Sequence, residues 1–224
     1  MGIAYTAKGE YDAAVEDFDH AIKLYPTNAP KNYPPIAPVY NNRAYAYAHK
    51  GDYGRAIADF TRSIELDPRS FGPYLTRAVV YLYAGKLSEA LADLNTLDAK
   101  NPNKSPYTAL WLDIVSKRAN QPSRMREQVT TQIDMSKWPA PLVRLHLGEL
   151  TTAEVLSAAD DPSPGIKQRH MCEANFYSGE RALQQGGKDE AARLFRLAAA
   201  GCVRQNFLEY VGANAELRQL ATPR

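Results

Sequence analysis

Apolar residues recur at helical spacing along most of the chain, in short stretches separated by glycine or proline. In one stretch Ala56 and Phe60 lie four residues apart, on the same face of a helix. Gly51 precedes this stretch and Pro68 follows it. A glycine can adopt the positive φ that ends one helix, and a proline stops the next because it lacks an amide donor. The pattern predicts a hairpin of two antiparallel helices.

This hairpin pattern is repeated along the first half of the chain. A glycine, an alanine, a large apolar residue and a proline occur in the same order in three copies: Gly9, Ala14, Phe18 and Pro26; Gly51, Ala56, Phe60 and Pro68; and Gly85, Ala90, Leu94 and Pro102. The second and third copies are 34 residues apart, and the first precedes the second by 42, which is 34 plus an insertion of eight. A fixed period of this length is typical of stacked helical repeats.

Beyond residue 104 the strict period fades, but the apolar spacing remains helical. Residues 105–165 are expected to form a degenerate hairpin and two short helices, the second capped by Thr151 with Glu154. A linker is expected at 160–165. Residues 166–224 predict a further hairpin that turns at Gly186 and Gly187, then a capping helix from about Asn206 to Leu220.

The first half resembles the tetratricopeptide repeat. The second and third copies match its signature positions with these residues: Tyr40, Ala44, Tyr47, Gly51, Tyr53, Ala56, Phe60 and Pro68; and Tyr74, Ala78, Tyr81, Gly85, Leu87, Ala90, Leu94 and Pro102. The resemblance implies an all-α fold, a right-handed superhelical stack of hairpins over residues 1–104. The first hairpin is shortened, because Gly2 already stands where its first helix should be half complete.

The same resemblance implies a concave groove lined by the first helix of each hairpin. The groove positions fall on these residues: Asn41, Asn42, Tyr45, His49, Thr76, Val79, Tyr83, Asp113 and Lys117. Tyrosine and asparagine offer apolar area together with amide donors and acceptors, which suits an extended peptide. The alternative is that they are solvated helix positions. A clamp for a chaperone's C-terminal carboxylate is not expected, because only Asn42 matches its residue types.

The second half adds a narrower resemblance to the NlpI-like family of exported bacterial repeat lipoproteins. It rests on short segments: 105–112, 145–148, 173–179 and 206–210. The resemblance implies a non-catalytic adaptor of the cell envelope, usually dimeric, that holds a cell-wall hydrolase and a processing protease together. The family's signal and lipidated cysteine are not present in this sequence, so membrane attachment is not carried over.

Two further features leave alternatives open. The insertion at 29–36 contains three prolines and predicts a loop, either a tolerated surface insertion or one whose Tyr33 and Ile36 contact a partner or a second subunit. Cys172 and Cys202 lie at ends of antiparallel helices that should meet, so they form either a disulfide or two buried thiols. A disulfide would require an oxidising compartment, in agreement with export to the periplasm if a signal peptide precedes this sequence.

Composition and motifs exclude several other classes. The net charge of +2 comes without basic blocks, so no nucleic-acid partner is expected. No apolar run is long enough to span a membrane, and the charges within the first twenty residues do not fit a secretory signal. The four histidines lie far apart, and no nucleophile elbow, phosphate loop or metal-ligand spacing occurs. We therefore expect no enzyme, no cofactor and no metal.

The sequence favours a scaffold that binds a protein or an extended peptide in its concave groove. The alternative is a structural or dimerisation module, a fragment of a longer repeat protein whose first hairpin packs on upstream repeats or on a second copy.

Overall fold

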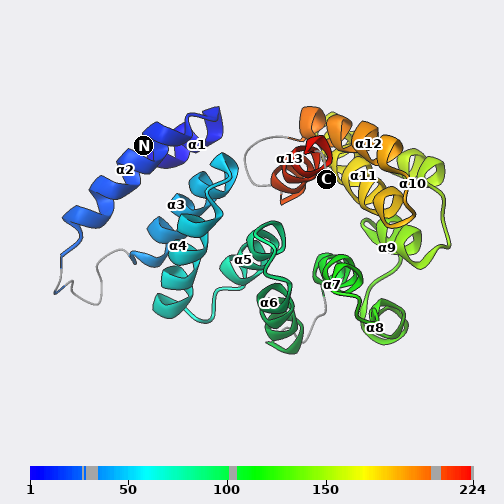
Figure 1. The fold of residues 1–224 in the computed structure, drawn as a ribbon, viewed down its shortest axis with the longest axis horizontal. Helices are drawn as coiled ribbons and strands as arrows, with labels where there is room; N and C mark the ends of the chain where they lie inside the picture. The colour runs from blue at the N-terminus through cyan, green and yellow to red at the C-terminus, as the bar shows by residue number, and fades with distance from the viewer. Residues whose placement is uncertain (27, 29–34, 101–104, 203–207, 223–224) are drawn as a thin grey trace. The chain divides into compact units, whose positions relative to one another are not determined.

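The computed structural model describes residues 1–26, 28, 35–100, 105–202 and 208–222, apart from the side chains of 130–132. Throughout this part of the chain the regular structure is α-helical, and it contains no strand (Figure 1). The predicted all-α fold of antiparallel helix hairpins is confirmed. The chain divides into two compact units, Met1–Asp93 and Leu94–Arg224. This division falls inside a helix, eleven residues before the boundary expected at 104.

The first unit consists of successive hairpins. Its helices are α1 (Gly2–Lys8), α2 (Tyr11–Leu24), α3 (Ala37–Lys50), α4 (Tyr53–Leu66), α5 (Gly72–Tyr83) and the first half of α6 (Leu87–Lys100). Gly9, Gly51 and Gly85 join the two helices of each pair, with φ between 75° and 80°. The prediction that these three glycines end the first helices is therefore confirmed.

Small residues let the paired helices of the first unit approach closely. Ala44 of α3 and Phe60 of α4 belong to one buried cluster, together with Ala56 and Val80. At the equivalent place in the first hairpin, a Cβ added to Gly2 would lie 2.7 Å from the ring of Phe18. The alternation of a small and a large residue, 16 positions apart in each hairpin, therefore sets the spacing between the helices.

Each of the second and third hairpins is also joined by a bidentate ion pair. Arg43 Nε and Nη2 donate to Asp59 at 2.6 and 2.7 Å, and Arg77 donates to Asp93 in the same way at 2.8 and 2.7 Å. Both aspartates are buried. The two pairs are 34 residues apart, so the ion pair repeats with the hairpin and aligns its two helices.

The second unit begins with the end of α6 and continues with helices of unequal length: α7 (Pro106–Arg118), α8 (Met125–Gln132), α9 (Ala140–Leu147), α10 (Thr152–Ala158), α11 (Pro164–Gln184), α12 (Lys188–Gly201) and α13 (Leu208–Ala221). The predicted capping box of α10 is confirmed, because Thr151 Oγ1 accepts from the amide of Glu154 while the Glu154 carboxylate accepts from the amide of Thr151.

Helices α11 and α12 repeat the packing of the first unit. A Cβ on Gly179 would lie 2.7 Å from the Phe195 ring, and these two residues are again 16 positions apart. Gly186 turns the chain between the helices with a φ of 84°. Helix α13 then packs on α12, as expected for a helix that caps the last hairpin.

One predicted boundary in the second unit was wrong, and with it the predicted position of Cys172. Helix α11 begins at Pro164 and not at 166, because proline fits the first turn of a helix and has no amide left unpaired there. Cys172 consequently lies inside α11, two turns from its start, and not at its beginning. The predicted start of the last helix, Asn206, and most of the insertion, 29–34 with Tyr33, lie outside the described residues.

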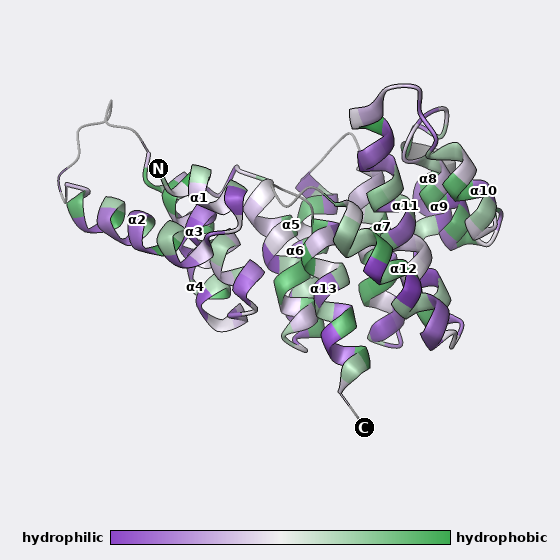
Figure 2. Ribbon diagram, turned by 90° about the horizontal axis from the view of Figure 1, so that it is seen from above, coloured by the Kyte–Doolittle hydropathy of each residue, from purple (hydrophilic) through white to green (hydrophobic). Residues whose placement is uncertain are grey.

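Hydrophilic residues recur along the helices of both units (Figure 2). Within the described ranges, none of the helices combines the length and the apolar character needed to cross a membrane.

Candidate functional site

The candidate site of the first unit centres on two adjacent asparagines of α3. The Asn42 side chain is half-buried and makes no hydrogen bond within the described part of the chain. Asn41 Oδ1 is buried and, among the same residues, also has no hydrogen-bond donor. A buried acceptor without a donor costs free energy. A ligand that supplies an N–H group to Asn41 Oδ1 would remove this cost and bind more tightly.

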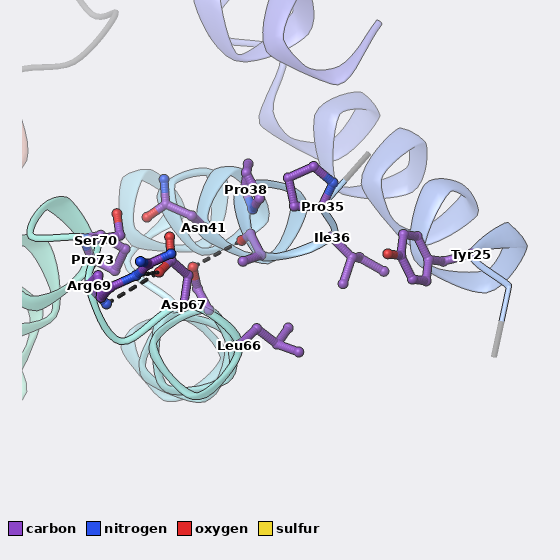
Figure 3. Close-up of a pocket in the computed structure, with 12 residues that line it drawn as sticks. Tyr25, Pro35, Ile36, Pro38, Asn41, Leu66, Asp67, Arg69, Ser70 and Pro73 are labelled. Carbon is purple, nitrogen blue, oxygen red and sulfur yellow. Dashed lines mark hydrogen bonds and ion pairs between the residues drawn. The ribbon is translucent and has the colours of Figure 1, made fainter. Parts of the chain in front are cut away.

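Asn41 lines a pocket between the start of α3 and the end of α4 (Figure 3). The pocket has a volume of about 560 Å³, and its walls are mainly apolar residues and prolines: Tyr25, Pro35, Ile36, Ala37, Pro38, Leu66 and Pro73. Polar groups also line it: Asn41, Ser63, Asp67, Arg69 and Ser70. We call this the α3–α4 pocket. The pocket combines apolar contact area with the hydrogen-bond acceptor Asn41 Oδ1, which is unpaired among the described residues.

Several polar groups of the α3–α4 pocket are already paired. Ser63 Oγ donates to the carbonyl oxygen of Ala37 over 2.9 Å, and this bond ties α4 to the first turn of α3. The Asp67 carboxylate accepts from the backbone amide of Arg69 at 3.3 Å, which orders the turn after α4. These contacts fix part of the pocket wall, beside the Asn41 acceptor.

Three large apolar side chains of the first unit are exposed at, or next in sequence to, residues that line the α3–α4 pocket. Leu66, which lines it, is 39 % exposed, and Phe71, which follows the loop residue Ser70, is 47 % exposed. Leu24 precedes the lining residue Tyr25 and is 78 % exposed. Exposed apolar residues gathered at one place mark an interaction surface more often than residues scattered singly.

Tyr45, predicted as a groove residue, is instead part of the packing between α3 and α5. Its hydroxyl lies 2.8 Å from Thr76 Oγ1, and its ring meets Phe60 edge-on at 5.5 Å. Thr76 donates in turn to the carbonyl of Gly72. Because the Thr76 hydroxyl gives its proton to Gly72, the Tyr45 hydroxyl is the donor to Thr76. Burial raises the pKa of Tyr45. Both polar groups are used within the unit.

The remaining predicted groove residues of the first unit are also engaged or buried. The His49 ring stacks on Tyr11 of α2 at 4.7 Å, with an angle of 5° between the planes. Val79 and Tyr83 are buried. The sequence predicted solvent-facing positions here, but these side chains offer little surface to a ligand. Helix α5 is buried on several faces, a property that a repeat signature does not encode.

Asp113 and Lys117, the groove residues predicted in the second unit, pair with each other. Lys117 Nζ donates to Asp113 Oδ2 over 2.7 Å, and the same carboxylate oxygen lies 2.8 Å from His146 Nδ1. Although burial opposes it, the hydrogen bonds from His146 and Lys117 lower the pKa of Asp113. Asp113 is fully buried and joins α7 to α9, whereas Lys117 remains partly exposed.

Of the two insertion residues, the structure describes only Ile36. It lies at the N-cap of α3 and lines the α3–α4 pocket beside Pro35. The structure thus brings together Ile36 and Asn41, which the sequence placed in two separate candidate surfaces.

A disulfide joins Cys172 of α11 to Cys202 at the end of α12, with 4.9 Å between the two Cα atoms. Both cysteines are buried. The bond links the two helices of the last hairpin across a sequence separation of 30 residues. The sequence left open whether the two cysteines form a disulfide or two buried thiols, and the structure has the disulfide.

Buried carboxylates of the second unit were not foreseen from the sequence. Glu173 Oε2 accepts from Tyr107 and from Trp138 Nε1 at 2.8 and 2.7 Å, and burial raises its pKa. Glu209 accepts from Tyr177 over 3.1 Å, and burial raises its pKa to about 7. The sequence signal for these two residues was a glutamate inside an apolar helical stripe. No spacing rule identified the partners of Glu173 and Glu209, which are distant in sequence.

Among the described residues, no group of three or more histidine, cysteine, aspartate or glutamate side chains is arranged to hold a metal ion.

Comparison with known protein families identifies the tetratricopeptide repeat twice, at residues 1–28 and at residues 37–70. These matches coincide with α1–α2 and with α3–α4. Residues 1–28 and 37–70 therefore match tetratricopeptide repeats, and the second of these segments contains the signature residues predicted for the second copy.

Several solved structures are similar to the chain at low identity. MamA AMB-1 is 16% identical over 89% of this chain and 94% of that chain, with a TM-score of 0.47. MamA MSR-1 is 17% identical over 89% and 91%, with a TM-score of 0.42. A tetratricopeptide repeat protein from Parabacteroides merdae is 17% identical over 99% and 96%, also with a TM-score of 0.42.

The repeats support a protein-interaction scaffold in general terms. Such repeats are stacked hairpins that present extended surfaces to other proteins.

Proposed function

We propose that this protein is a non-catalytic scaffold whose first unit binds an extended segment of a partner protein. The observation that carries the proposal is the α3–α4 pocket, where the unpaired acceptor of Asn41 lies among apolar walls. The neighbouring Asn42 adds an amide that can donate to or accept from a peptide backbone. An extended segment presents both apolar side chains and unpaired backbone groups, so it matches this combination.

The proposed ligand contributes apolar side chains and one backbone N–H. Leu66 and Ile36 give it contact area, while the amide pair fixes the register of its backbone. The walls carry few charged groups, and Arg69 lies 4.0 Å from Asp67. Recognition here would therefore depend little on long-range electrostatics.

We also propose that the scaffold works in the bacterial cell envelope, as an NlpI-like adaptor for hydrolases or proteases. The Cys172–Cys202 disulfide supports an oxidising compartment such as the periplasm. The short segments that resemble the NlpI-like family support the adaptor role. Homodimerisation, which the resemblance also implies, belongs to the same proposal.

Selection from a peptide library displayed on phage tests the ligand. We expect the wild-type chain to enrich apolar sequences and the double variant N41A/N42A to bind them about 10- to 100-fold more weakly, because each lost hydrogen bond costs about 1 kcal/mol. The matched control is R62A/E65A, which removes two polar side chains from the exposed face of α4. Equal binding by the Asn41/Asn42 variant, at unchanged helical content, would place the binding site elsewhere.

A further inference from the structure

A second pocket, of about 560 Å³, lies within the second unit. It is lined by residues of α7, α11, α12 and α13: Lys117, Arg118, Glu180, Arg181, Leu183, Gln184, Lys188, Glu216 and Gln219. We call it the α11–α12 pocket. Four of the lining residues are cations and two are carboxylates, so the question is which of these charges remain unpaired.

Arg118 forms the rigid floor of the pocket. Its Nη2 donates to both carboxylate oxygens of Glu180, at 2.9 and 2.7 Å, and lies 2.6 Å from Glu216 Oε1. The contact with Glu216 is an ion pair without hydrogen-bond geometry. Both glutamates are fully buried. One guanidinium thus connects α7, α11 and α13, and the pocket floor is held in place before any ligand arrives.

The charges of the floor lie against one another. Arg118 contacts both buried carboxylates, Glu180 and Glu216. Burial raises the pKa of Glu180, an effect that the Arg118 charge opposes and the neighbouring Glu216 carboxylate reinforces. Lys117 is balanced separately by Asp113 at 2.7 Å.

Two cations in the wall remain without a counter-charge. Among the residues that the structure describes, neither Arg181 nor Lys188 has an ion pair or a hydrogen bond from its side chain. Arg181 is half-buried on α11, and Lys188 is the exposed first residue of α12. Both line the α11–α12 pocket.

An amide donor in the same wall is also unsatisfied. Gln184 Oε1 accepts from Lys117 Nζ over 3.2 Å, and this bond fixes which way the amide faces. Gln184 Nε2 is buried and, within the described ranges, has no acceptor. A buried donor without an acceptor is unusual, and an anionic oxygen in the pocket would supply one.

We propose that the α11–α12 pocket binds a side-chain carboxylate of an acidic segment in the partner protein, through Arg181, Lys188 and Gln184. This inference deepens the proposed scaffold function and rests on it. A planar carboxylate matches the fork of an arginine and accepts several hydrogen bonds at once. The site is distinct from the chaperone-type clamp excluded above, because none of that clamp's positions falls on α11 or α12.

Titration of the whole chain with two defined peptides tests this pocket alone. The probes are acetyl-Gly-Glu-Glu-Gly-amide and acetyl-Gly-Gln-Gln-Gly-amide, followed by ¹⁵N NMR. We expect the glutamate peptide to shift the amide signals of residues 181–188 in a saturable way and the glutamine peptide to leave them unchanged. Equal shifts with both peptides would overturn the proposal.

Charge variants provide the second arm of the test. In R181Q/K188Q the Kd for the glutamate peptide should rise at least about tenfold, since both charge-assisted contacts are removed. The control R193Q/R196Q loses the same charge from exposed positions of α12 and should keep the wild-type Kd. Equal weakening in both variants would mean non-specific charge attraction and overturn the proposal.

Inorganic phosphate separates a peptide carboxylate from a free anion. If phosphate at the same concentration reproduced the shifts of the glutamate peptide at residues 181–188, the pocket would be a general anion site and the proposal would be wrong. Failure of these titrations leaves the apolar peptides selected on the first unit untouched, so the two proposals fail separately.

Discussion

At the scale of single residues, the pairing of a small and a large side chain across each hairpin is the strongest determinant of the packing. Gly2 faces Phe18, and Gly179 faces Phe195. Ala44 and Phe60 take the same places in the second hairpin and share one buried cluster. The pair is maintained although the rest of the last hairpin departs from the repeat signature, because the helices cannot approach without it.

Replacing Gly179 with Ala tests this packing. The added Cβ would lie 2.7 Å from the Phe195 ring, so the helices must separate or the ring must turn. We expect the free energy of unfolding to fall by about 1–3 kcal/mol, measured by urea denaturation followed by circular dichroism.

The control for this substitution is in the same helix. Gly165→Ala places its Cβ in open space, so α11 should be unchanged or gain up to about 1 kcal/mol. If both variants had the same stability, close approach at Gly179 would not determine the packing of α11 on α12.

The groove residues show where sequence reasoning stops at this scale. A repeat signature assigns Thr76 and Asp113 to a helix face, but it contains no information about the partners of their side chains. Thr76 accepts from Tyr45, and Asp113 binds Lys117 and His146. Asp113 and His146 are 33 positions apart, so no local spacing predicts their hydrogen bond. Within the described ranges Asn41 Oδ1 and the Asn42 side chain have no such partners, and for that reason they remain in the candidate site.

At the scale of elements, the helices were predictable because turns and caps are local. Gly9, Gly51 and Gly85 adopt the expected positive φ, and the Thr151–Glu154 capping box forms as its spacing indicates. The start of α11 was misplaced, since Pro164 was interpreted as a linker residue although proline also suits a first helical turn. The repeated Arg43–Asp59 and Arg77–Asp93 pairs obey the 34-residue period and could have been found from it.

The disulfide between α11 and α12 makes a quantitative prediction for the last hairpin. In the chain-entropy account, closing a loop of this length restricts the unfolded chain and stabilises the folded one by about 3–4 kcal/mol. The variant C172S/C202S should lose about that amount in urea denaturation, and a reducing agent should destabilise the wild-type chain but not the variant.

Mass spectrometry under non-reducing conditions completes that experiment. Protein folded in an oxidising environment should carry no thiol that alkylates. Two alkylated cysteines in such material would contradict the bond and remove the support that it gives to an exported scaffold.

At the scale of the whole molecule, each of the two compact units has a pocket with its own chemistry. The α3–α4 pocket is mainly apolar and includes the Asn41 acceptor, whereas the α11–α12 pocket includes two cations, Arg181 and Lys188, that have no ion pair among the described residues. The near-neutral net charge of +2 hides this difference, because acidic residues balance the basic ones elsewhere. The sequence predicted a scaffold from its repeats, whereas both pockets depend on how side chains of different helices pack together.

The central claim, that the α3 face of the first unit contacts a partner protein, can be tested directly by photo-crosslinking in living cells. A photoreactive benzoylphenylalanine is placed at Asn42 or, as the control, at Ala58, which is exposed on α4. We predict adducts with a different protein from position 42 and none from position 58. Adducts from position 58 alone would contradict the claim, and so would a position-42 adduct that contains only two copies of this chain.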